Sequence, residues 1–246
     1  MMGWSEAIIL AAGSGRRLGK ATHGRPKCLI EVGGRTILDR QMRSLREVGV
    51  SRFVVVCGYR ASDVEAAARE GAGGAAVAAV YNERYAETNV LTSWILGSRH
   101  LEGNHIYAHA DTVFSPALLQ RLVNEGTASI NLTYDRHECG AEEMKLRLEG
   151  GELVQVSKAM ESTAAHGEFT GIMSVQGHVL PDLRAVAHEL LQSRDADRLF
   201  VEAALQELLD RGRGELFSLV DISGIPWREI DFPEDLASAN QMFAEG

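Results

Sequence analysis

Cysteine, proline and aromatic residues are scarce in this chain of 246 residues, which contains 3 Cys, 5 Pro, 7 Phe, 5 Tyr and 3 Trp. The cysteines (Cys28, Cys57 and Cys139) are too few and too widely spaced for a disulfide framework or a zinc site. Long apolar runs are missing too, since no stretch approaches the ~20 apolar residues of a membrane-spanning helix. The sequence therefore predicts neither a disulfide-stapled scaffold nor a membrane-embedded protein.

The chain also lacks an excess of basic residues, because 25 Lys and Arg face 34 Asp and Glu, for a formal net charge of −9. An acidic protein can bind an anion locally, but a broad patch for nucleic acid or a membrane surface is not expected. The beginning, MMGWSEAIILAAGSG, has no basic segment before its short apolar run and does not match a signal peptide. We therefore expect a cytoplasmic protein.

Apolar runs and helical patterns alternate through the first half of the chain. Continuous apolar runs predict buried strands at residues 7–12 and 53–57, and further strands are expected at 76–80 and 105–110. Helical spacing of apolar residues predicts helices at 37–48, at 63–70 and around Trp94. This alternation favours an α/β fold, with a Rossmann-like, mostly parallel sheet flanked by helices.

The second half of the chain has a different pattern. Two short strands, at residues 146–149 and 152–156, flank Gly150-Gly151 and predict an antiparallel hairpin that forms a wall or lid beside the sheet. Helices are expected at 182–192 and 197–211, the second with Leu199 among its inward residues. With no repeat and no Pro/Ser-rich linker, we expect one domain spanning residues 1–246.

A glycine-rich loop, Gly13-Ser14-Gly15-Arg16-Arg17-Leu18, directly follows the first predicted strand. Glycines there let backbone N–H groups approach a phosphate closely, and the arginines supply positive charge. A dinucleotide fingerprint would need a small residue in place of Leu18, and a Walker A loop would need Gly at 14 and Ser or Thr at 21. The loop therefore predicts a phosphate site of another kind, with a solvated basic loop as the alternative.

Two aspartates stand where ligands are expected. Asp111 ends a predicted parallel strand, and ligands in such sheets bind beyond the carboxyl ends of the strands. Asp231 precedes Pro233 and Glu234, a spacing that also suits a helix capping box. A helix cap ahead of Pro116 is the corresponding alternative for Asp111. Position and spacing alone leave these alternatives open.

The run L-A-A-G-x-G-x-R-L from Leu10 to Leu18, followed by Pro26-Lys27, resembles the signature of the nucleotidylyltransferase superfamily, which makes nucleotide sugars and CDP-alcohols. The resemblance implies that Arg17 grips the leaving pyrophosphate and that Lys27 helps to hold the phosphates, both as catalytic groups. It implies that the rest of the loop lines the nucleotide: Leu10, Ala11, Ala12, Gly13, Ser14 and Gly15.

The same resemblance implies a role for the two aspartates. Asp111 and Asp231 occupy the places of the residues that hold Mg²⁺ on the nucleotide, and Asp111 also counts among the nucleotide contacts. A divalent cation offsets the repulsion between two phosphate groups that must react. No protein nucleophile is expected, because the acceptor already carries a nucleophilic oxyanion.

Within the superfamily, segments around residues 81–93, 143–145 and 156–172 resemble cytidylyltransferases that act on small phosphorylated alcohols or phosphonates. This likeness places Thr88, Asn89 and Ser93 beside the pyrimidine. It also makes Lys158 and Lys145 the candidates for contacting the acceptor phosphate, without deciding between them. His109 shares a strand face with Asp111 and is expected beside the site.

The expected reaction is therefore Mg²⁺-dependent transfer of CMP from CTP to a small phosphonate or phosphomonoester, with release of pyrophosphate. The expected partners are these small-molecule substrates, and a homodimer is compatible with the sequence. Two alternatives stay open: a sugar-1-phosphate nucleotidylyltransferase that uses UTP or dTTP, and a nucleotide-binding regulator without catalytic activity. Retention of Arg17, Lys27, Asp111 and Asp231 weighs against the regulator.

Overall fold

A computed structural model describes residues 3–244, and its centre is a sheet with a parallel core. Four neighbouring strands in the order β6-β1-β4-β5 are all parallel. They are β1 (Glu6–Ala11), β4 (Arg52–Cys57), β5 (Ala76–Tyr81) and β6 (His105–His109). The continuous apolar runs of β1, β4 and β6 reflect burial on both faces: in β1, Ile8 packs into one hydrophobic cluster, and Ala7 and Ile9 pack into another. Strand β5, at the edge of the sheet, is only partly buried.

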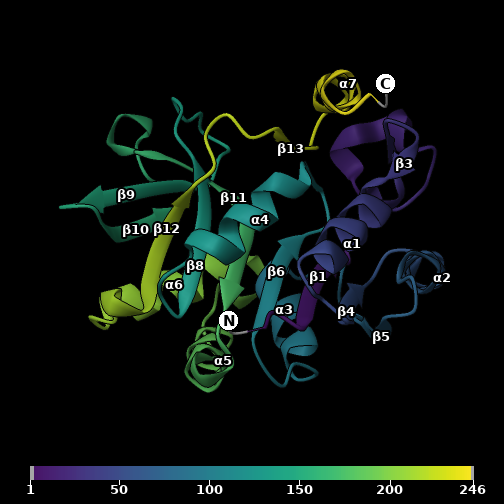
Figure 1. Cartoon of the computed structure of the whole chain (residues 1–246). Coiled ribbons are helices and arrows are strands. Elements are labelled where there is room, and N and C mark those ends of the chain that lie inside the picture. Colours follow the sequence, from purple (N-terminus) through teal and green to yellow (C-terminus); the bar gives the residue numbers. More distant parts are fainter. Residues whose placement is uncertain (1–2, 245–246) are drawn as a thin grey trace.

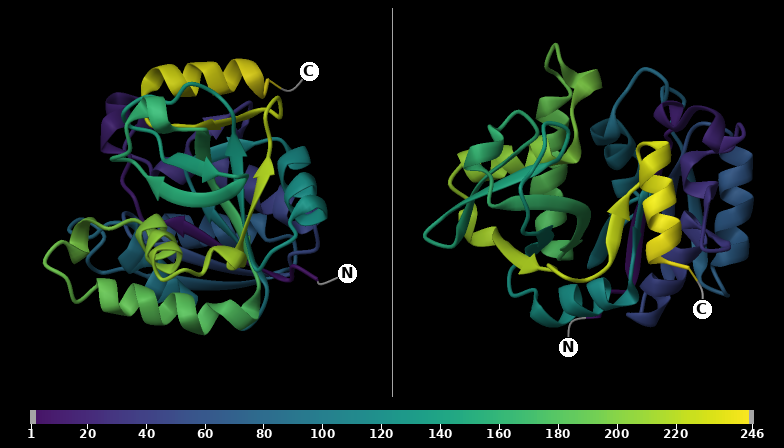
Figure 2. Two further views of the ribbon diagram at one scale, coloured as in Figure 1. Left: turned by 90° about the vertical axis from the view of Figure 1, so that its left-hand side faces the viewer. Right: turned by 90° about the horizontal axis from the view of Figure 1, so that it is seen from above.

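Helices cover both faces of this sheet (Figures 1 and 2). One hydrophobic cluster joins the sheet to α1 (Ile37–Glu47), α2 (Ala61–Gly71) and α4 (Pro116–Glu125). The other joins it to α3 (Val90–Ser98), α5 (Leu180–Leu190) and α6 (Val201–Asp210). The predicted α/β fold with a mostly parallel sheet flanked by helices is confirmed.

An antiparallel extension continues the sheet beyond β6. Strand β11 (Gly167–Val175) runs antiparallel to β6 and also pairs with β8 (Ile130–Asp135), which in turn pairs with β12 (Phe217–Asp221). The predicted hairpin is β9 (Lys145–Glu149) with β10 (Glu152–Ser157), and it joins the sheet through β11. The hairpin therefore forms a wall next to the carboxyl ends of the parallel strands.

The C-terminal segment returns to the top of the parallel strands, where two small ribbons lie, as Figure 1 shows. Strand β13 (Trp227–Glu229) pairs with β7 (Thr112–Phe114), and β2 (Glu31–Val32) pairs with β3 (Arg35–Thr36). Beyond β13, the Ile230 N–H donates to the Asp111 carbonyl at 3.0 Å. The chain then enters α7 (Pro233–Met242), so residues far apart in sequence meet above β6 and β1.

The helix predicted to begin at residue 197 begins later, at Val201. Residues 196–198 form a single 3-10 turn, and Leu199 and Phe200 have extended backbone before α6 starts. Leu199 still packs against the core, although it lies outside the helix. The spacing of apolar residues predicted that Leu199 packs inward, but it did not predict the extended backbone that separates this residue from α6.

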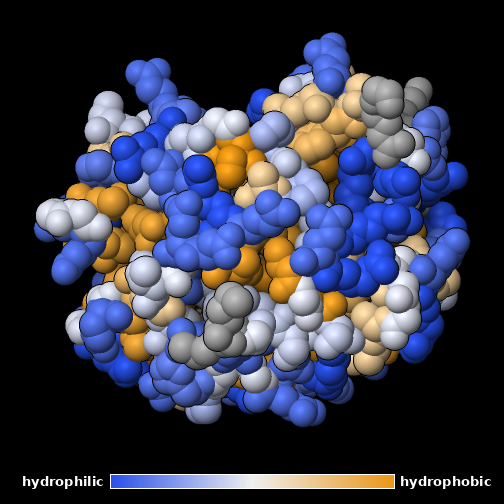
Figure 3. Space-filling view, in the orientation of Figure 1, coloured by the Kyte–Doolittle hydropathy of each residue, from blue (hydrophilic) through white to orange (hydrophobic). Residues whose placement is uncertain are grey.

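The face of the molecule in Figure 3 is largely hydrophilic, and its apolar side chains appear in separate patches. None of the helices in residues 3–244 combines the length and apolarity needed to cross a bilayer.

Candidate active site

The glycine-rich loop connects β1 to a 3-10 segment (Arg16–Thr22) at the carboxyl edge of the sheet. Gly15 has φ of +67°, and a Cβ there would lie 3.1 Å from the Lys27 Cβ, so a glycine suits both the backbone and the close approach. Leu18 is buried and fastens the end of the loop to a small hydrophobic cluster under α7. The loop is therefore anchored, while Arg16 and Arg17 remain exposed beside it.

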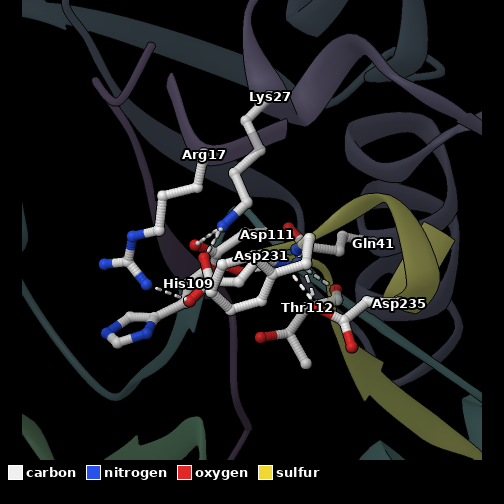
Figure 4. A network of polar contacts seen from close by, with 9 residues as sticks. Arg17, Lys27, Gln41, His109, Asp111, Thr112, Asp231 and Asp235 are labelled. Carbon is white, nitrogen blue, oxygen red and sulfur yellow. Dashed lines mark hydrogen bonds and ion pairs between the residues drawn. The ribbon is translucent and has the colours of Figure 1, made fainter. Parts of the chain in front are cut away.

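Four charged side chains from three parts of the chain meet at the end of β6 (Figure 4). The Lys27 Nζ lies 2.8 Å from an Asp111 oxygen and 2.5 Å from an Asp231 oxygen. The other Asp231 oxygen accepts a hydrogen bond from Arg17 at 2.6 Å. The structure thus brings together Arg17, Lys27, Asp111 and Asp231, the four residues that the sequence singled out.

The electrostatics of this cluster follow from burial and close pairing. Burial alone would lower the pKa of Lys27, but the charges of Asp111 and Asp231 outweigh it and hold the pKa well above its ordinary value. Burial would raise the pKa of Asp111, yet Lys27 and, to a lesser extent, His109 hold it below the ordinary value. Lys27 therefore carries its positive charge, and Asp111 its negative charge, at neutral pH.

A third carboxylate, Glu229, joins the two aspartates. Burial, reinforced by the charge of Asp111, raises the pKa of Glu229 to about 7. One oxygen from each of Asp111, Glu229 and Asp231 lies within 4.8 Å of the others, an arrangement that could hold a metal ion. Glu229 was not recognised from the sequence, although the alternation Glu229-Ile230-Asp231 places two carboxylates on one face.

The capping alternatives have a clear outcome. Helix α7 begins after Phe232, and the Asp235 carboxylate accepts hydrogen bonds from the N–H groups of Asp231 and Phe232 at 3.1 and 2.8 Å. The expected pairing of Asp231 with Glu234 was therefore wrong by one residue, and the Asp231 side chain is left to face Lys27. Asp111 caps no helix either, because Ser115 caps α4.

A pocket of about 330 Å³ opens beside this cluster, between the glycine loop and the antiparallel wall. The predicted site residues that line it are Gly13, Ser14, Gly15, Arg17, Lys27, Asn89, Asp111, Lys158 and Asp231. Leu10 and Ala11 line a smaller cavity of about 30 Å³ that shares Lys27 and Asp111, while Ala12 is buried at the end of β1.

The three residues expected beside the pyrimidine are not equivalent. Asn89 lines the pocket and also caps α3, its side-chain oxygen accepting from the Val90 N–H at 2.8 Å. Thr88 and Ser93 instead accept hydrogen bonds from the side chain of Asn82, at 3.1 and 3.0 Å. Ser93 is buried, so its hydrogen bond with Asn82 stabilises the loop before α3, and its side chain does not line the pocket.

The two candidate lysines also separate. Lys158 lines the pocket, and its Nζ lies 5.0 Å from the centroid of the Phe200 ring. Lys145 is 1% exposed, and its Nζ donates to the backbone carbonyls of Ala141, Glu143 and Lys158 at 3.1, 3.1 and 2.8 Å. Its ammonium is thus fully engaged in holding the loops together, and Lys145 does not line the pocket beside Lys27 and Asp111.

His109 and Glu202 face the same pocket. The His109 Nε2 lies 2.5 Å from the Tyr107 hydroxyl, and Gly171 leaves room for the ring, because a Cβ there would lie 2.8 Å from Nδ1. Glu202 stands in the first turn of α6 with 2% of its surface exposed. It was not recognised from the sequence, where it is one acid within an apolar helical pattern.

A second pocket, of about 420 Å³, adjoins the first and shares Glu229 and Asp231 with it. Asp135, Glu143 and Glu168 make it strongly acidic. Burial raises the pKa of Glu168 to about 8, and the neighbouring charges of Glu143, Glu229 and Asp135 add to this shift. This acidic pocket therefore holds a carboxyl group that is mostly protonated near neutral pH.

Residues 7–199 match the model of the MobA-like NTP transferase domain. The chain belongs to this family. The predicted resemblance to the nucleotidylyltransferase superfamily is thereby confirmed. Among curated relatives, the "Bifunctional IPC transferase and DIPP synthase" of Rubrobacter xylanophilus is 32% identical over 96% of this chain and 51% of its own length.

Two further likenesses extend along nearly the whole chain. The "CMP-5'-(3-aminopropyl)phosphonate synthase" of Streptomyces rubellomurinus is 30% identical over 97% of this chain and 39% of its own length. The chain thus spans about half, or less, of the length of these two relatives. The inositol-1-phosphate CTP transferase from T. maritima has the same fold, with a TM-score of 0.80, 22% identity, and coverage of 99% of this chain and 98% of that chain.

Proposed function

We propose that this chain is a Mg²⁺-dependent cytidylyltransferase that transfers CMP from CTP to a small phosphonate or phosphorylated alcohol. The observation that carries the proposal is the cluster of Arg17, Lys27, Asp111 and Asp231 at the mouth of a pocket at the strand ends. The names of two relatives support the nucleotide and acceptor, since one is a CMP-phosphonate synthase and one solved structure is a CTP transferase. We propose further that residues 1–246 act as one domain on small-molecule substrates.

The residues present fit a bound Mg²⁺. The donors of Asp111, Glu229 and Asp231 are carboxylate oxygens, which this cation prefers, and the buried Asp111 Oδ1 has no hydrogen-bond partner within residues 3–244. These residues would hold the ion, with Asp111 and Asp231 as its main ligands. When bound, Mg²⁺ would neutralise negative charge that builds on the phosphates during transfer.

Different side chains of the pocket bind different parts of the two substrates. The N–H groups of the glycine loop and the Arg17 guanidinium bind the outer phosphates of CTP, and Lys27 exchanges its carboxylate contacts for the reacting phosphate. Lys158, on the other side of the pocket, holds the acceptor phosphate or phosphonate. An acceptor oxygen forms a new bond to the α-phosphorus while the bond to the β-phosphate oxygen breaks, and pyrophosphate leaves with that electron pair. Catalysis thus consists of positioning and charge stabilisation.

Release of pyrophosphate tests the proposal. The purified chain is incubated with each of the four NTPs and with phosphonates, phosphocholine, phosphoethanolamine or sugar 1-phosphates, with Mg²⁺ or with excess EDTA. We expect turnover with CTP and a small acceptor, and loss of turnover in EDTA. Turnover restricted to UTP or dTTP with a sugar 1-phosphate would overturn the choice of substrates. CTP binding without turnover on any acceptor would favour a regulator.

A further inference from the structure

Glu202 is a buried carboxylate without a partner. Neither of its oxygens has a hydrogen-bond partner within the described part of the chain. The nearest cationic candidate is His109, whose Nε2 lies 3.9 Å from Glu202 Oε1, too far for a hydrogen bond. That nitrogen is also engaged with the Tyr107 hydroxyl at 2.5 Å. The fold therefore buries Glu202 at the pocket without supplying a donor.

Such an arrangement is costly unless a ligand completes it. A carboxylate that is removed from water and left without hydrogen bonds destabilises the folded protein. The position of Glu202 in the first turn of α6 offsets part of this cost, because the helix N-terminus favours negative charge. A positively charged donor offsets the rest better than a neutral one, since hydrogen bonds between charged groups are the stronger kind.

The surroundings of Glu202 also suit a cation. It lines the pocket together with the aromatic residues Phe169 and Phe200, and the ring of Phe200 already has the Lys158 ammonium 5.0 Å from its centroid. A ring face beside a carboxylate is a favourable place for an ammonium group. Lys158 itself makes no ion pair with Glu202 within 4.0 Å among the described residues.

We propose that Glu202 recognises a positively charged amine on the acceptor, so that the acceptor is an amino-phosphonate or amino-alcohol phosphate. The inference rests on the proposed function, because it assigns the acceptor of that reaction. Lys158 and Glu202 line one pocket and carry opposite charges, so a small zwitterion can place its phosphate against one and its amine against the other. Arg17 and Lys27 stand at the glycine-loop side of this pocket, where the nucleotide phosphates bind.

Glu168 in the acidic pocket is the rival position for the amine. It is nearly as buried as Glu202, at 6% exposed, but its Oε2 already lies 3.2 Å from the His137 Nε2. Glu168 therefore has a basic neighbour within the fold, whereas Glu202 has none within hydrogen-bond distance among the described side chains. This difference makes Glu168→Gln a matched control for Glu202→Gln.

The test compares three phosphonates of nearly equal size, with CTP and Mg²⁺. They are 2-aminoethylphosphonate, 2-hydroxyethylphosphonate and propylphosphonate, which end in an ammonium, a hydroxyl and a methyl group. We expect the unmodified protein to favour the amine by roughly 100-fold in kcat/KM over the other two. Glu202→Gln should reduce that preference at least tenfold through the KM for the amine, with a smaller change in the KM for CTP. Glu168→Gln should keep the preference.

Each other result has a definite meaning. Equal use of amine and hydroxyl by the unmodified protein, or an unchanged preference in Glu202→Gln, would overturn the amine assignment while the cytidylyltransferase proposal stood. Loss of the preference in Glu168→Gln alone would place the amine in the acidic pocket and overturn the role of Glu202. Absence of CMP transfer to every phosphonate in the unmodified protein, with phosphocholine, phosphoethanolamine and sugar 1-phosphates also inactive, would overturn both.

Discussion

The two ends of the parallel strands treat buried carboxylates in opposite ways. At the amino end, Glu6 on β1 accepts hydrogen bonds from the N–H groups of Glu102 and Gly103 at 2.8 and 2.7 Å and pairs with Arg52. At the carboxyl end, one oxygen of Asp111 and both oxygens of Glu202 have no hydrogen-bond partner within residues 3–244. Both ends are buried and charged, but only the first is complete within the protein.

This contrast distinguishes a carboxylate that stabilises the fold from carboxylates that are available to bind a ligand. The protein groups around Glu6 outweigh its burial and hold its pKa below the ordinary value, so the carboxylate stabilises the fold. Around Asp111, the protein supplies Lys27 to one oxygen, and the other, which is buried, has no hydrogen-bond partner among the described residues. An incomplete set of contacts at the strand ends is the expected state of a site that awaits substrate.

The largest expected effect is at the carboxyl end. Asp111→Asn should reduce turnover roughly 10³-fold or more, because it removes a charge that balances the phosphate-binding cations and would hold Mg²⁺. Lys27 keeps its ion pair with Asp231 in this variant, so we expect the variant to keep a cooperative thermal transition. Steady-state kinetics with circular dichroism on the same sample checks both points.

The matched control for this variant is Asp221→Asn. Asp221 also lies at a strand end, on β12, but its Oδ1 is bound by the N–H and hydroxyl of Ser223 at 2.9 and 2.6 Å. The turnover of Asp221→Asn should stay within about twofold of that of the unmodified protein, since Asp221 lines neither pocket. Near-normal turnover in Asp111→Asn would remove Asp111 from the metal site and weaken the contrast between the two ends.

At the amino end, the expected effect is on stability. Glu6→Ala should lower the free energy of unfolding by about 3 kcal/mol, because two N–H groups and Arg52 lose their shared acceptor. Glu102→Ala is the control: its exposed carboxylate lies 3.8 Å from Arg52 and should contribute less than about 0.5 kcal/mol. Urea denaturation measures both values. Equal changes in the free energy of unfolding in the two variants would show that the contacts of the Glu6 carboxylate do not stabilise the amino end of the sheet.

The same contrast explains what the sequence could predict. Strand ends and glycine loops have local patterns, so Lys27, Asp111 and the glycine loop were assigned from their positions and from the family signature. Asp231 needed the resemblance, because its approach to Asp111 depends on the pairing of β13 with β7. Its capping partner was assigned to Glu234, but the turn geometry selects Asp235.

The misplaced residues have a shared physical cause. Lys145 and Ser93 carry polar groups in segments that resemble binding motifs, yet tertiary contacts bury both and engage them with the protein. Glu202 is the opposite case, a site residue that the sequence did not reveal. Periodicity gives no sign that an acidic residue in a helix is buried without a hydrogen-bond partner among the described residues. Whether a polar group is satisfied depends on long-range packing, and a local pattern does not contain that information.

The smallest expected effect comes from the acidic pocket, between the two extremes. The pKa of Glu168 rises from 4.5 to about 8 on folding, so between these values the folded state binds a proton that the unfolded state releases. Stability must therefore fall as pH rises through this window. Glu168→Gln removes the titration, and its unfolding free energy relative to the unmodified protein should become more favourable by roughly 1–2 kcal/mol between pH 6 and pH 7.

Thermal or urea unfolding at both pH values measures this change, with the exposed Glu161→Gln as a control that should show no pH-dependent difference. A relative stability of Glu168→Gln that does not vary with pH would mean that the carboxyl is already ionised in the folded protein. Glu168 would then resemble Glu6, with its charge balanced by protein neighbours such as His137. A pH-dependent difference would instead show that the carboxyl is protonated in the folded protein, because burial and the neighbouring carboxylates outweigh the proximity of His137.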